Sequence, residues 1–250
     1  MVYLLTCVLK IVISHLCILK IIESSAENVY LCTRYLANDT DKLKMTAMKN
    51  DCLCVALVLV GWLTLSSCHT SRLQVADLLF HVSAEPNAIT EVTPGMIDHV
   101  AIYLGGDSVI EAVGKGVVIT PLDSLFRQDG YYLAGRTSTN KKTTIARSLM
   151  FLGRAYDYLY LPDNEEIYCS ELVQCSYVDK KGYLMFSTIP MSFHDNTGNI
   201  TSYWRDFYAR HGMDVPEGAP GTNPAELSQR DNVKLVGRLE HEGGKYIIMR

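Results

Sequence analysis

The sequence predicts an α+β fold, because strand-type and helix-type segments come in blocks along the chain instead of alternating. Short apolar or alternating runs, separated by turn signals, lie before residue 121. Segments with helical spacing of apolar residues follow between residues 140 and 211. Two further strand-type runs, at 233–239 and 245–249, end the chain. We therefore expect a small antiparallel sheet packed on helices, and not a parallel doubly wound sheet.

The first strands are expected between residues 73 and 120. Residues 73–81 contain a short apolar run, and residues 98–104 alternate in polarity as a strand does. The Gly-Gly-Asp sequence at 105–107 is a hairpin turn signal. Residues 108–113 are expected to return as the partner strand, and residues 117–120 to form the next one.

Three helices are expected in the second half of the chain, at 140–153, 168–178 and 201–211. Two of them end at a glycine, Gly153 and Gly212, which is the usual residue after a helix. In the first helix, the apolar face that we expect to be buried consists of Ile145, Leu149 and Leu152.

The N-terminal region is interpreted as an export signal. An apolar stretch of 14 residues follows Lys49, and small residues precede Cys68. That stretch is short for a membrane span, although a short anchor or a buried helix is an alternative. Residues 65–68, Leu-Ser-Ser-Cys, also resemble a bacterial lipobox, in which the cysteine is lipidated and becomes the mature N-terminus.

These features divide the chain into three parts. Residues 1–44 are interpreted as an over-extended reading frame, since a signal peptide does not begin so far before its cleavage site. A first transmembrane helix is the alternative, which Lys10 and Lys20 disfavour. Residues 45–68 are the predicted lipoprotein signal peptide, and residues 69–250 the predicted globular domain.

Charge and cysteine content narrow the possible functions. The net charge is −4 and no basic run stands out, so we expect no nucleic-acid partner. Only Cys169 and Cys175 lie beyond residue 68. Six residues apart on a helix, their positions are separated by about 9 Å along the axis. A disulfide needs Cα atoms within about 7 Å, so we expect two free thiols.

Cys169 is the first candidate for chemistry, because it shares a helix face with apolar residues and therefore points inward. Near a helix N-terminus the helix dipole favours a thiolate. This effect is strong if the helix begins at about Tyr168, and weaker if Asp163 and Glu166 form an earlier capping box. A buried, inert cysteine is the alternative.

His99 and Glu111 are the next candidates, since they occupy the two strands of the predicted hairpin. If the turn centres on Gly106, the carboxylate lies within a diagonal step of the imidazole. It could then fix the imidazole while the other ring nitrogen takes a proton from a thiol. The alternative is that both side chains simply face water.

Other sites are less well supported. His194 is the second candidate for a base, whereas His81, His211 and His241 are interpreted as loop or surface residues. Residues 69–250 contain no HxH, HExxH or CxxC spacing, so we expect no metal and no other cofactor. They also contain no GxSxG motif of a serine hydrolase.

Several segments together resemble the YiiX/YebB-like branch of the NlpC-type cysteine hydrolases, which have a circularly permuted papain fold. The most specific are Cys-Ser-Glu-Leu-Val at 169–173 and His-Val-Ala-Ile at 99–102. The weaker matches are residues 75–80, 109–113, 116–118 with 121–122, and 153–157. The histidine precedes the cysteine, as in the permuted branch. Alanine stands at position 76, where the family often has glycine, and at position 155, where a proline is usual.

The resemblance implies that Cys169 is a nucleophile, His99 a base and Glu111 the residue that orients it. It also implies that the Tyr156 hydroxyl holds the oxyanion, although Tyr156 could equally be an ordinary packed aromatic residue. We expect a cell-envelope hydrolase on the periplasmic side, anchored to the membrane through Cys68. The expected reaction is cleavage of an amide bond in peptidoglycan-type peptides. A thioesterase or lipid acyl hydrolase is one alternative, and a non-catalytic binding module is another.

Overall fold

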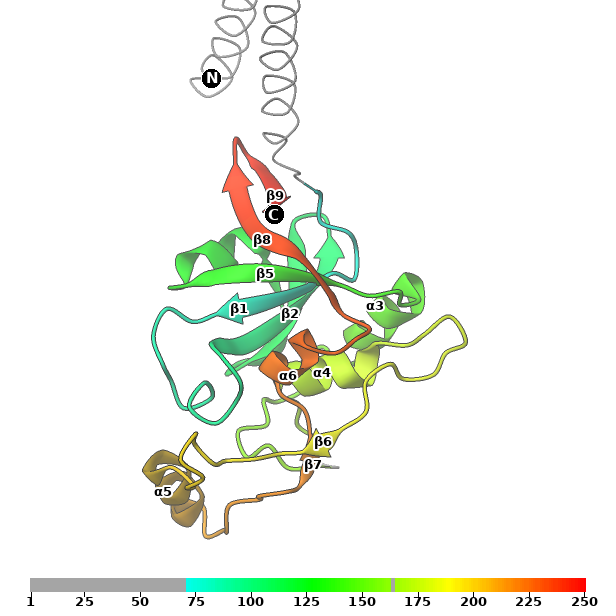
Figure 1. The fold of residues 1–250 in the computed structure, drawn as a ribbon. Helices are drawn as coiled ribbons and strands as arrows, with labels where there is room; N and C mark the ends of the chain where they lie inside the picture. Colours follow the sequence, from blue (N-terminus) through cyan, green and yellow to red (C-terminus); the bar gives the residue numbers. More distant parts are fainter. Residues whose placement is uncertain (1–70, 163–164) are drawn as a thin grey trace, which may run out of the picture. The chain divides into compact units, whose positions relative to one another are not determined.

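In the computed structural model, which describes residues 71–162 and 165–250, seven strands form one antiparallel sheet (Figure 1). The strand order is β4-β3-β2-β1-β5-β8-β9. The strands are β1 Leu78–Val82, β2 Ile97–Gly105, β3 Ser108–Val113, β4 Gly116–Pro121, β5 Tyr131–Arg136, β8 Lys234–Glu242 and β9 Lys245–Met249. The sheet is therefore larger than the small sheet that the sequence predicted. The predictions on residues 1–44, the signal peptide at 45–68, Cys68 and a cap at Asp163 lie outside the described residues.

The remaining described elements are short. They are the 3-10 helix η1 Leu122–Arg127, the helices α3 Lys141–Met150, α4 Cys169–Ser176, α5 Ser202–Arg210 and α6 Pro224–Ser228, and the paired strands β6 Ile189–Pro190 and β7 Pro220–Gly221. The helix α4 contacts β2 and β3, and α6 contacts β1 and β2. Among these described helices, none has the length and apolar character needed to cross a membrane.

The β2–β3 hairpin forms where the sequence predicts it. Gly106 and Asp107 both have a φ of 57°, the positive backbone angle that a two-residue hairpin turn of type I′ requires. Ile102 pairs with Ile110 and Tyr103 with Val109 across the hairpin. Continued by one residue, this register sets Glu111 opposite Ala101, as expected.

A fully buried core lies between the sheet and α4. It combines alternate residues of β2 with the inward face of α4, where Leu172 and Val173 have no exposed surface. Ala101, between Val100 and Ile102, points to a second core on the other side of the sheet, formed with η1, β8 and β9. The predicted alternation of β2 is therefore confirmed.

The strand β5 was not predicted, although it lies inside the sheet, between β1 and β8. Its sequence lacks regular alternation because Tyr132, Ala134 and Gly135 are all buried. At Gly135, a Cβ atom would lie 2.6 Å from the ring of Phe80, so only glycine fits beside this ring. Close packing, and not hydrophobic pattern, determines this strand.

The predicted buried face of α3 is confirmed at Ile145, which packs against the main core, and is wrong at the two leucines. Leu149 and Leu152 are 41% and 49% exposed, whereas Thr144 and Ser148 are buried. The Thr144 hydroxyl lies 2.6 Å from that of Thr139 and accepts a hydrogen bond from the backbone of Val178. The helix thus packs on the end of α4 through hydroxyl groups as well as Ile145, whereas Leu149 and Leu152 remain at the surface.

A third hydrophobic cluster lies around α5, apart from the sheet in Figure 1. Its buried members are Met191, Phe193, Trp204 and Tyr208. Thr201 caps the helix by accepting a hydrogen bond from the Trp204 backbone, and the Trp204 indole donates to the carbonyl of Ala88. This lobe holds aromatic side chains beside the N-terminus of α4.

Ala76 adopts a left-handed conformation, with a φ of 64°. Glycine adopts this conformation without strain, which accounts for its frequent use at this position in the family that the sequence resembles. The carbonyl of Ala76 accepts a hydrogen bond from the buried Tyr177 hydroxyl, and the next residue, Asp77, forms a two-bond ion pair with Arg136. Contacts with distant residues therefore hold the alanine in place.

Candidate active site

Cys169 is the first residue of α4 and is 5% exposed. The sequence left two helix starts open, and the structure has the later one, with Tyr168 as the N-cap residue. The Glu171 carboxylate accepts a hydrogen bond from the Tyr168 backbone N–H, at 3.3 Å. The thiol is free of any disulfide and lies at the positive end of the helix dipole, which favours a thiolate.

Two contacts fix the start of α4 against the segment that leads into α6. The Ser170 hydroxyl donates to the carbonyl of Thr222, and the Tyr168 hydroxyl accepts from the Thr222 backbone N–H at 3.1 Å. Because both residues flank Cys169, the position of its sulfur atom is set by two separate parts of the chain.

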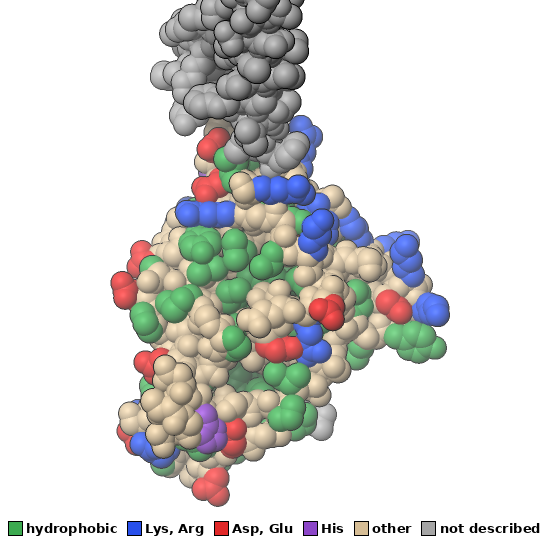
Figure 2. All heavy atoms as spheres, in the orientation of Figure 1, with side chains coloured by type: hydrophobic (Ala, Val, Ile, Leu, Met, Phe, Trp, Pro, Cys, Tyr) green, Lys and Arg blue, Asp and Glu red, His purple; other side chains and the backbone are tan. Residues whose placement is uncertain are grey.

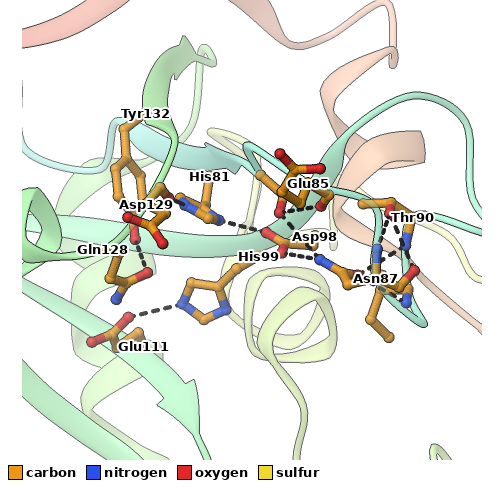
Figure 3. A network of polar contacts seen from close by, with 12 residues as sticks. His81, Glu85, Asn87, Thr90, Asp98, His99, Glu111, Gln128, Asp129 and Tyr132 are labelled. Atoms are coloured by element: carbon orange, nitrogen blue, oxygen red, sulfur yellow. Dashed lines mark hydrogen bonds and ion pairs between the residues drawn. The ribbon is translucent and has the colours of Figure 1, made fainter.

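His99 and Glu111 lie together as the sequence predicts, with Nε2 of the imidazole 2.8 Å from Oε2 of the carboxylate (Figure 3). Their side chains are only 17% and 4% exposed. The hairpin register described above brings the two residues within this diagonal distance.

Cys169, the third residue of the expected triad, also interacts with the pair of His99 and Glu111. Burial by itself lowers the pKa of His99, but hydrogen bonding to Cys169 and Glu111 and the charges of both partners raise it to about 10. Burial tends to raise the pKa of Glu111, yet the hydrogen bond and charge of His99, with a hydrogen bond from Thr120, hold it below its ordinary value. The structure thus brings Cys169, His99 and Glu111 into one connected group.

A second histidine was misjudged from the sequence. His81 was expected in a loop or at the surface, but it lies in β1 and is 8% exposed. Its Nδ1 is 2.6 Å from Oδ1 of Asp98, and its Nε2 is 2.6 Å from the carbonyl of Asp129 (Figure 3). The other oxygen of Asp98 accepts a hydrogen bond from Asn87. A polar side chain that was expected outside is therefore buried, because both of its ring nitrogens have a hydrogen-bond partner.

Tyr156 is brought to the same place by a bridge between its backbone and that of Ile167, two residues before Cys169. Burial, followed by the charge of Cys169, raises the pKa of the Tyr156 hydroxyl, as does a hydrogen bond with Tyr160. Tyr160 was not singled out from the sequence. The Tyr-Asp-Tyr-Leu-Tyr run at 156–160 is the signal that could have indicated it.

A cleft of about 540 Å³, counted to its open mouth, lies beside Cys169. Most of its wall is apolar or aromatic, and Asp98 supplies one carboxylate. The wall comprises Ile89, Val92, Thr93, Asp98, Tyr156, Tyr160, Tyr168, Ser170, Met191, Ser192, Phe193, Trp204, Thr222, Asn223 and Pro224. The α5 lobe contributes the largest side chains. Sequence reasoning identified α5 but not its place in this wall.

The remaining candidates lie elsewhere. The side chain of His194 is 36% exposed and contacts Glu217 and Ser192, not Cys169. Burial raises the pKa of the Cys175 thiol to about 11.

On the face drawn in Figure 2, hydrophobic side chains gather over the sheet, and lysine and arginine side chains lie mainly toward the top, where β8 runs.

Comparison with known proteins supports this description. The family of permuted papain-like amidase enzymes, YaeF/YiiX (C92), matches residues 72–237. No curated protein matched the chain. The crystal structure of the metalloprotein yiiX from Escherichia coli O157:H7 aligns with a TM-score of 0.57 and 20% sequence identity. The alignment covers 67% of this chain and 98% of that one. At this identity the similarity concerns the fold.

Within residues 71–162 and 165–250, no group of three or more His, Cys, Asp or Glu side chains is placed to hold a metal ion. The family match spans about two thirds of the chain and includes both strands of the hairpin and the cysteine helix. The chain therefore belongs to the permuted papain-like amidase family, an enzyme family of the cysteine peptidase and amidase type.

Proposed function

We propose that this chain is an amide-cleaving cysteine hydrolase in which Cys169 is the nucleophile, His99 the general base and acid, and Glu111 the residue that orients His99. The observation that carries the proposal is the position of His99, which interacts with the thiol and the buried carboxylate at the same time. Its raised pKa means that the imidazole holds a proton at neutral pH, which favours a thiolate on Cys169.

The reaction then follows the general course of cysteine hydrolases. The thiolate attacks the carbonyl carbon of the substrate, and the electron pair of the C=O bond moves to the oxygen. In this proposal the first backbone N–H of α4 and the Tyr156 hydroxyl donate hydrogen bonds to this oxyanion. His99 gives its proton to the leaving amine as the C–N bond breaks, leaving a thioester on Cys169.

Hydrolysis of the thioester restores the enzyme. His99, now neutral, takes a proton from a water molecule as the water oxygen attacks the thioester carbon. The C–S bond breaks, the acid product leaves, and the thiolate forms again beside the protonated imidazole. Glu111 stays ionised throughout, because its pKa is held below the ordinary value.

We propose peptidoglycan-type peptides as the first substrate class. The support is the predicted signal peptide at 45–68, whose lipidation at Cys68 would place the enzyme at the cell envelope. Replacing Cys68 by serine should abolish incorporation of an alkyne fatty acid into the expressed protein, and mass spectrometry of the labelled peptide would locate the lipid. Incorporation that survives this substitution would contradict the anchor.

The cleft favours a second candidate, the hydrolysis of an amide, ester or thioester of an acyl chain. Ile89, Met191, Phe193 and Trp204 present an apolar wall, which suits an apolar acyl group. The one carboxylate in the wall, Asp98, already accepts hydrogen bonds from His81 and Asn87. It is therefore less suited to bind a substrate amine than a free carboxylate would be.

The first experiment tests the nucleophile. Iodoacetamide at pH 7 should alkylate Cys169 at least about 100-fold faster than Cys175, because Cys169 lies beside His99 at the start of α4, whereas burial raises the pKa of the Cys175 thiol to about 11. Cys169→Ala should abolish hydrolysis, and Cys175→Ala is the matched control that should retain it. Equal, slow labelling of both thiols would favour a non-catalytic binding module instead.

The second experiment tests the substrate class. The wild-type chain and the Cys169→Ala variant are incubated separately with muropeptides, with N-acyl amines and with acyl thioesters. Release of amine, acid or thiol that depends on Cys169 identifies the class. Cleavage of muropeptides alone would support the first candidate, and cleavage of the acyl substrates alone would support the second.

A further inference from the structure

A second groove adjoins the cleft beside Cys169, and the reaction proposed above gives it no role. Its volume is about 1350 Å³, counted to its open mouth, and Val92 and Thr93 line both the groove and the cleft. The rest of its wall consists of Thr90, Glu91, Pro94, Gly95, His194, Asp195, Asn196, Thr201 and Ser202. Because the two hollows share Val92 and Thr93, a substrate bound in the cleft lies next to the groove.

The segment around Phe193 forms the other boundary between the cleft and the groove. Phe193 lines the cleft, whereas the next residue, His194, lines the groove. The carboxylate of Glu217 fixes both of them. Its Oε2 accepts a hydrogen bond from the Phe193 backbone N–H at 2.7 Å, and its Oε1 lies 3.1 Å from Nδ1 of His194. One carboxylate therefore holds a wall residue of each hollow in place.

The groove presents hydrogen-bond acceptors. With the Nδ1 hydrogen of His194 directed at Glu217, Nε2 of the neutral ring is an acceptor. Oδ1 of Asp195 accepts from the backbone and hydroxyl of Thr197 and from the backbone of Asn199. Within the described part of the chain, no hydrogen bond is donated to Oδ2 of Asp195 or to the Glu91 carboxylate. These acceptors are therefore left for a ligand that carries several N–H groups.

The charge of the groove has one sign. Its wall includes the carboxylates of Glu91 and Asp195, and neither lysine nor arginine is among the residues that line it. The loop that carries Glu91 is also fixed in shape. Oδ1 of Asn87 accepts from the backbone N–H of Thr90, and Nδ2 of Asn87 donates to Asp98 at 2.6 Å (Figure 3). The groove is therefore preformed and suited to a cation.

We propose that this groove is a second substrate site, which binds a positively charged group on the amine side of the amide whose apolar acyl group occupies the cleft. An ammonium or guanidinium group would donate charge-assisted hydrogen bonds to Glu91 and Asp195. A carboxylate of the substrate would be repelled by both. The inference rests on the proposed function and narrows the substrate class to amides of amines that carry a second, cationic group.

The test measures binding to the purified full chain with the substitution Cys169→Ala, which prevents hydrolysis of the probes. Three probes share an octanoyl amide and differ at the far end of the amine. N-octanoyl cadaverine ends in an ammonium group, N-octanoyl pentylamine in a methyl group and N-octanoyl aminohexanoate in a carboxylate. In isothermal titration calorimetry the cationic probe should bind about 5- to 10-fold more tightly than the neutral one, as expected for partly exposed ion pairs. The anionic probe should bind most weakly.

The preference for the cation should depend on the two carboxylates of the groove. Adding Glu91→Gln and Asp195→Asn together should bring the affinities of the cationic and neutral probes within about 2-fold of each other. Glu91→Gln alone should reduce the preference by about 2- to 3-fold. Since no described residue is hydrogen-bonded to the Glu91 carboxylate, this variant tests the groove even if the double variant does not fold.

Glu242→Gln is the matched control, because it removes an exposed carboxylate at the end of β8, outside the groove. It should keep the full preference for the cationic probe, and melting temperatures show whether each variant is folded. Equal affinities of the three probes for the chain with an intact groove would overturn the inference. A preference that persists in Glu91→Gln or in the folded double variant would also overturn it.

Failure of the proposed function is detected separately. The wild type and Cys169→Ala are compared on p-nitrophenyl butyrate, an activated ester from which a nucleophilic thiol releases nitrophenol. Release that survives Cys169→Ala would overturn the proposed function, whereas the probe affinities, measured without the thiol, test the groove alone.

Discussion

Two buried histidine–carboxylate pairs lie side by side in the described part of the molecule. His81 of β1 and His99 of β2 are direct partners in the sheet register (Figure 3). Each imidazole contacts a carboxylate, Asp98 at 2.6 Å or Glu111 at 2.8 Å. In each pair the pKa of the histidine is raised and that of the acid lowered. By these measures the two pairs are alike.

They differ in what the second ring nitrogen contacts. In His81 it faces the carbonyl of Asp129, which can only accept a hydrogen bond and never changes its protonation. In His99 it is left for Cys169, whose thiol can lose and regain a proton. A histidine paired with a carboxylate is therefore structural in β1 and suited to catalysis in β2. The difference is the partner of the second ring nitrogen, a carbonyl for His81 and a thiol for His99.

The largest expected effect comes from removing the imidazole beside the thiol. His99→Ala should lower kcat about 10³-fold or more, because both proton transfers depend on this group. Hydrolysis of p-nitrophenyl butyrate and alkylation of Cys169 by iodoacetamide would measure it. His81→Ala is the comparison, and an equal loss of kcat in that variant would break the distinction between the two pairs.

Glu111→Gln should have the next largest effect, a decrease in kcat of about 100-fold, because the amide no longer stabilises a protonated His99. In the wild type, activity that depends on the ion pair should persist up to about pH 10, the pKa of His99. Without the carboxylate this alkaline limit should move to lower pH. A pH–rate profile that is the same for both proteins would show that Glu111 does not orient His99.

The sequence predicts the proximity of His99 and Glu111, the pair that we propose to be catalytic, better than the partners of His81, for a physical reason. A hairpin with a Gly-Gly-Asp turn has a register that follows from the turn, so the proximity of His99 and Glu111 could be deduced from local spacing. The partners of His81 come from a neighbouring strand and from residue 129, beyond the reach of local spacing. The same limit applies to β5, whose place depends on the contact of Gly135 with Phe80.

The residues of the candidate site could be predicted from the sequence to the same extent as the fold. Cys169, at the start of its helix, could be predicted from the position of apolar residues around it. Tyr160 and the α5 wall could not, because a left-handed tyrosine and an aromatic lobe are fixed by contacts distant in sequence. Residues placed by a turn or a helix face can be predicted, whereas residues placed by packing between segments cannot.

His81→Gln should reduce stability and leave the chemistry intact. The substitution removes the ion pair with Asp98, whose side chain is 17% exposed, and should lower the free energy of unfolding by about 2 kcal/mol. Denaturant unfolding measures this value, and kcat should stay within about 3-fold of the wild type. A stable variant with a large loss of kcat would instead assign His81 to the reaction.

The smallest expected effect is the pH dependence of this stabilisation. Because the hydrogen bond with Asp98 raises the pKa of His81 against the effect of burial, its contribution is complete below the ordinary value of 6.5. It is lost as the pH rises through the raised value. The pKa of Asp98 is lowered, despite burial, by the hydrogen bond and charge of His81, so its contribution is present above 3.8 and is lost in stronger acid. The difference in melting temperature between the wild type and His81→Gln should therefore be largest between pH 4 and 6.5 and decrease toward alkaline pH.

For His99→Ala, the corresponding difference in melting temperature should persist to about pH 10, because the thiol and Glu111 keep the proton on His99 up to a higher pH. Melting curves of the three proteins across this range would test whether the added thiol separates the two pairs, and coincident pH profiles would show that it does not.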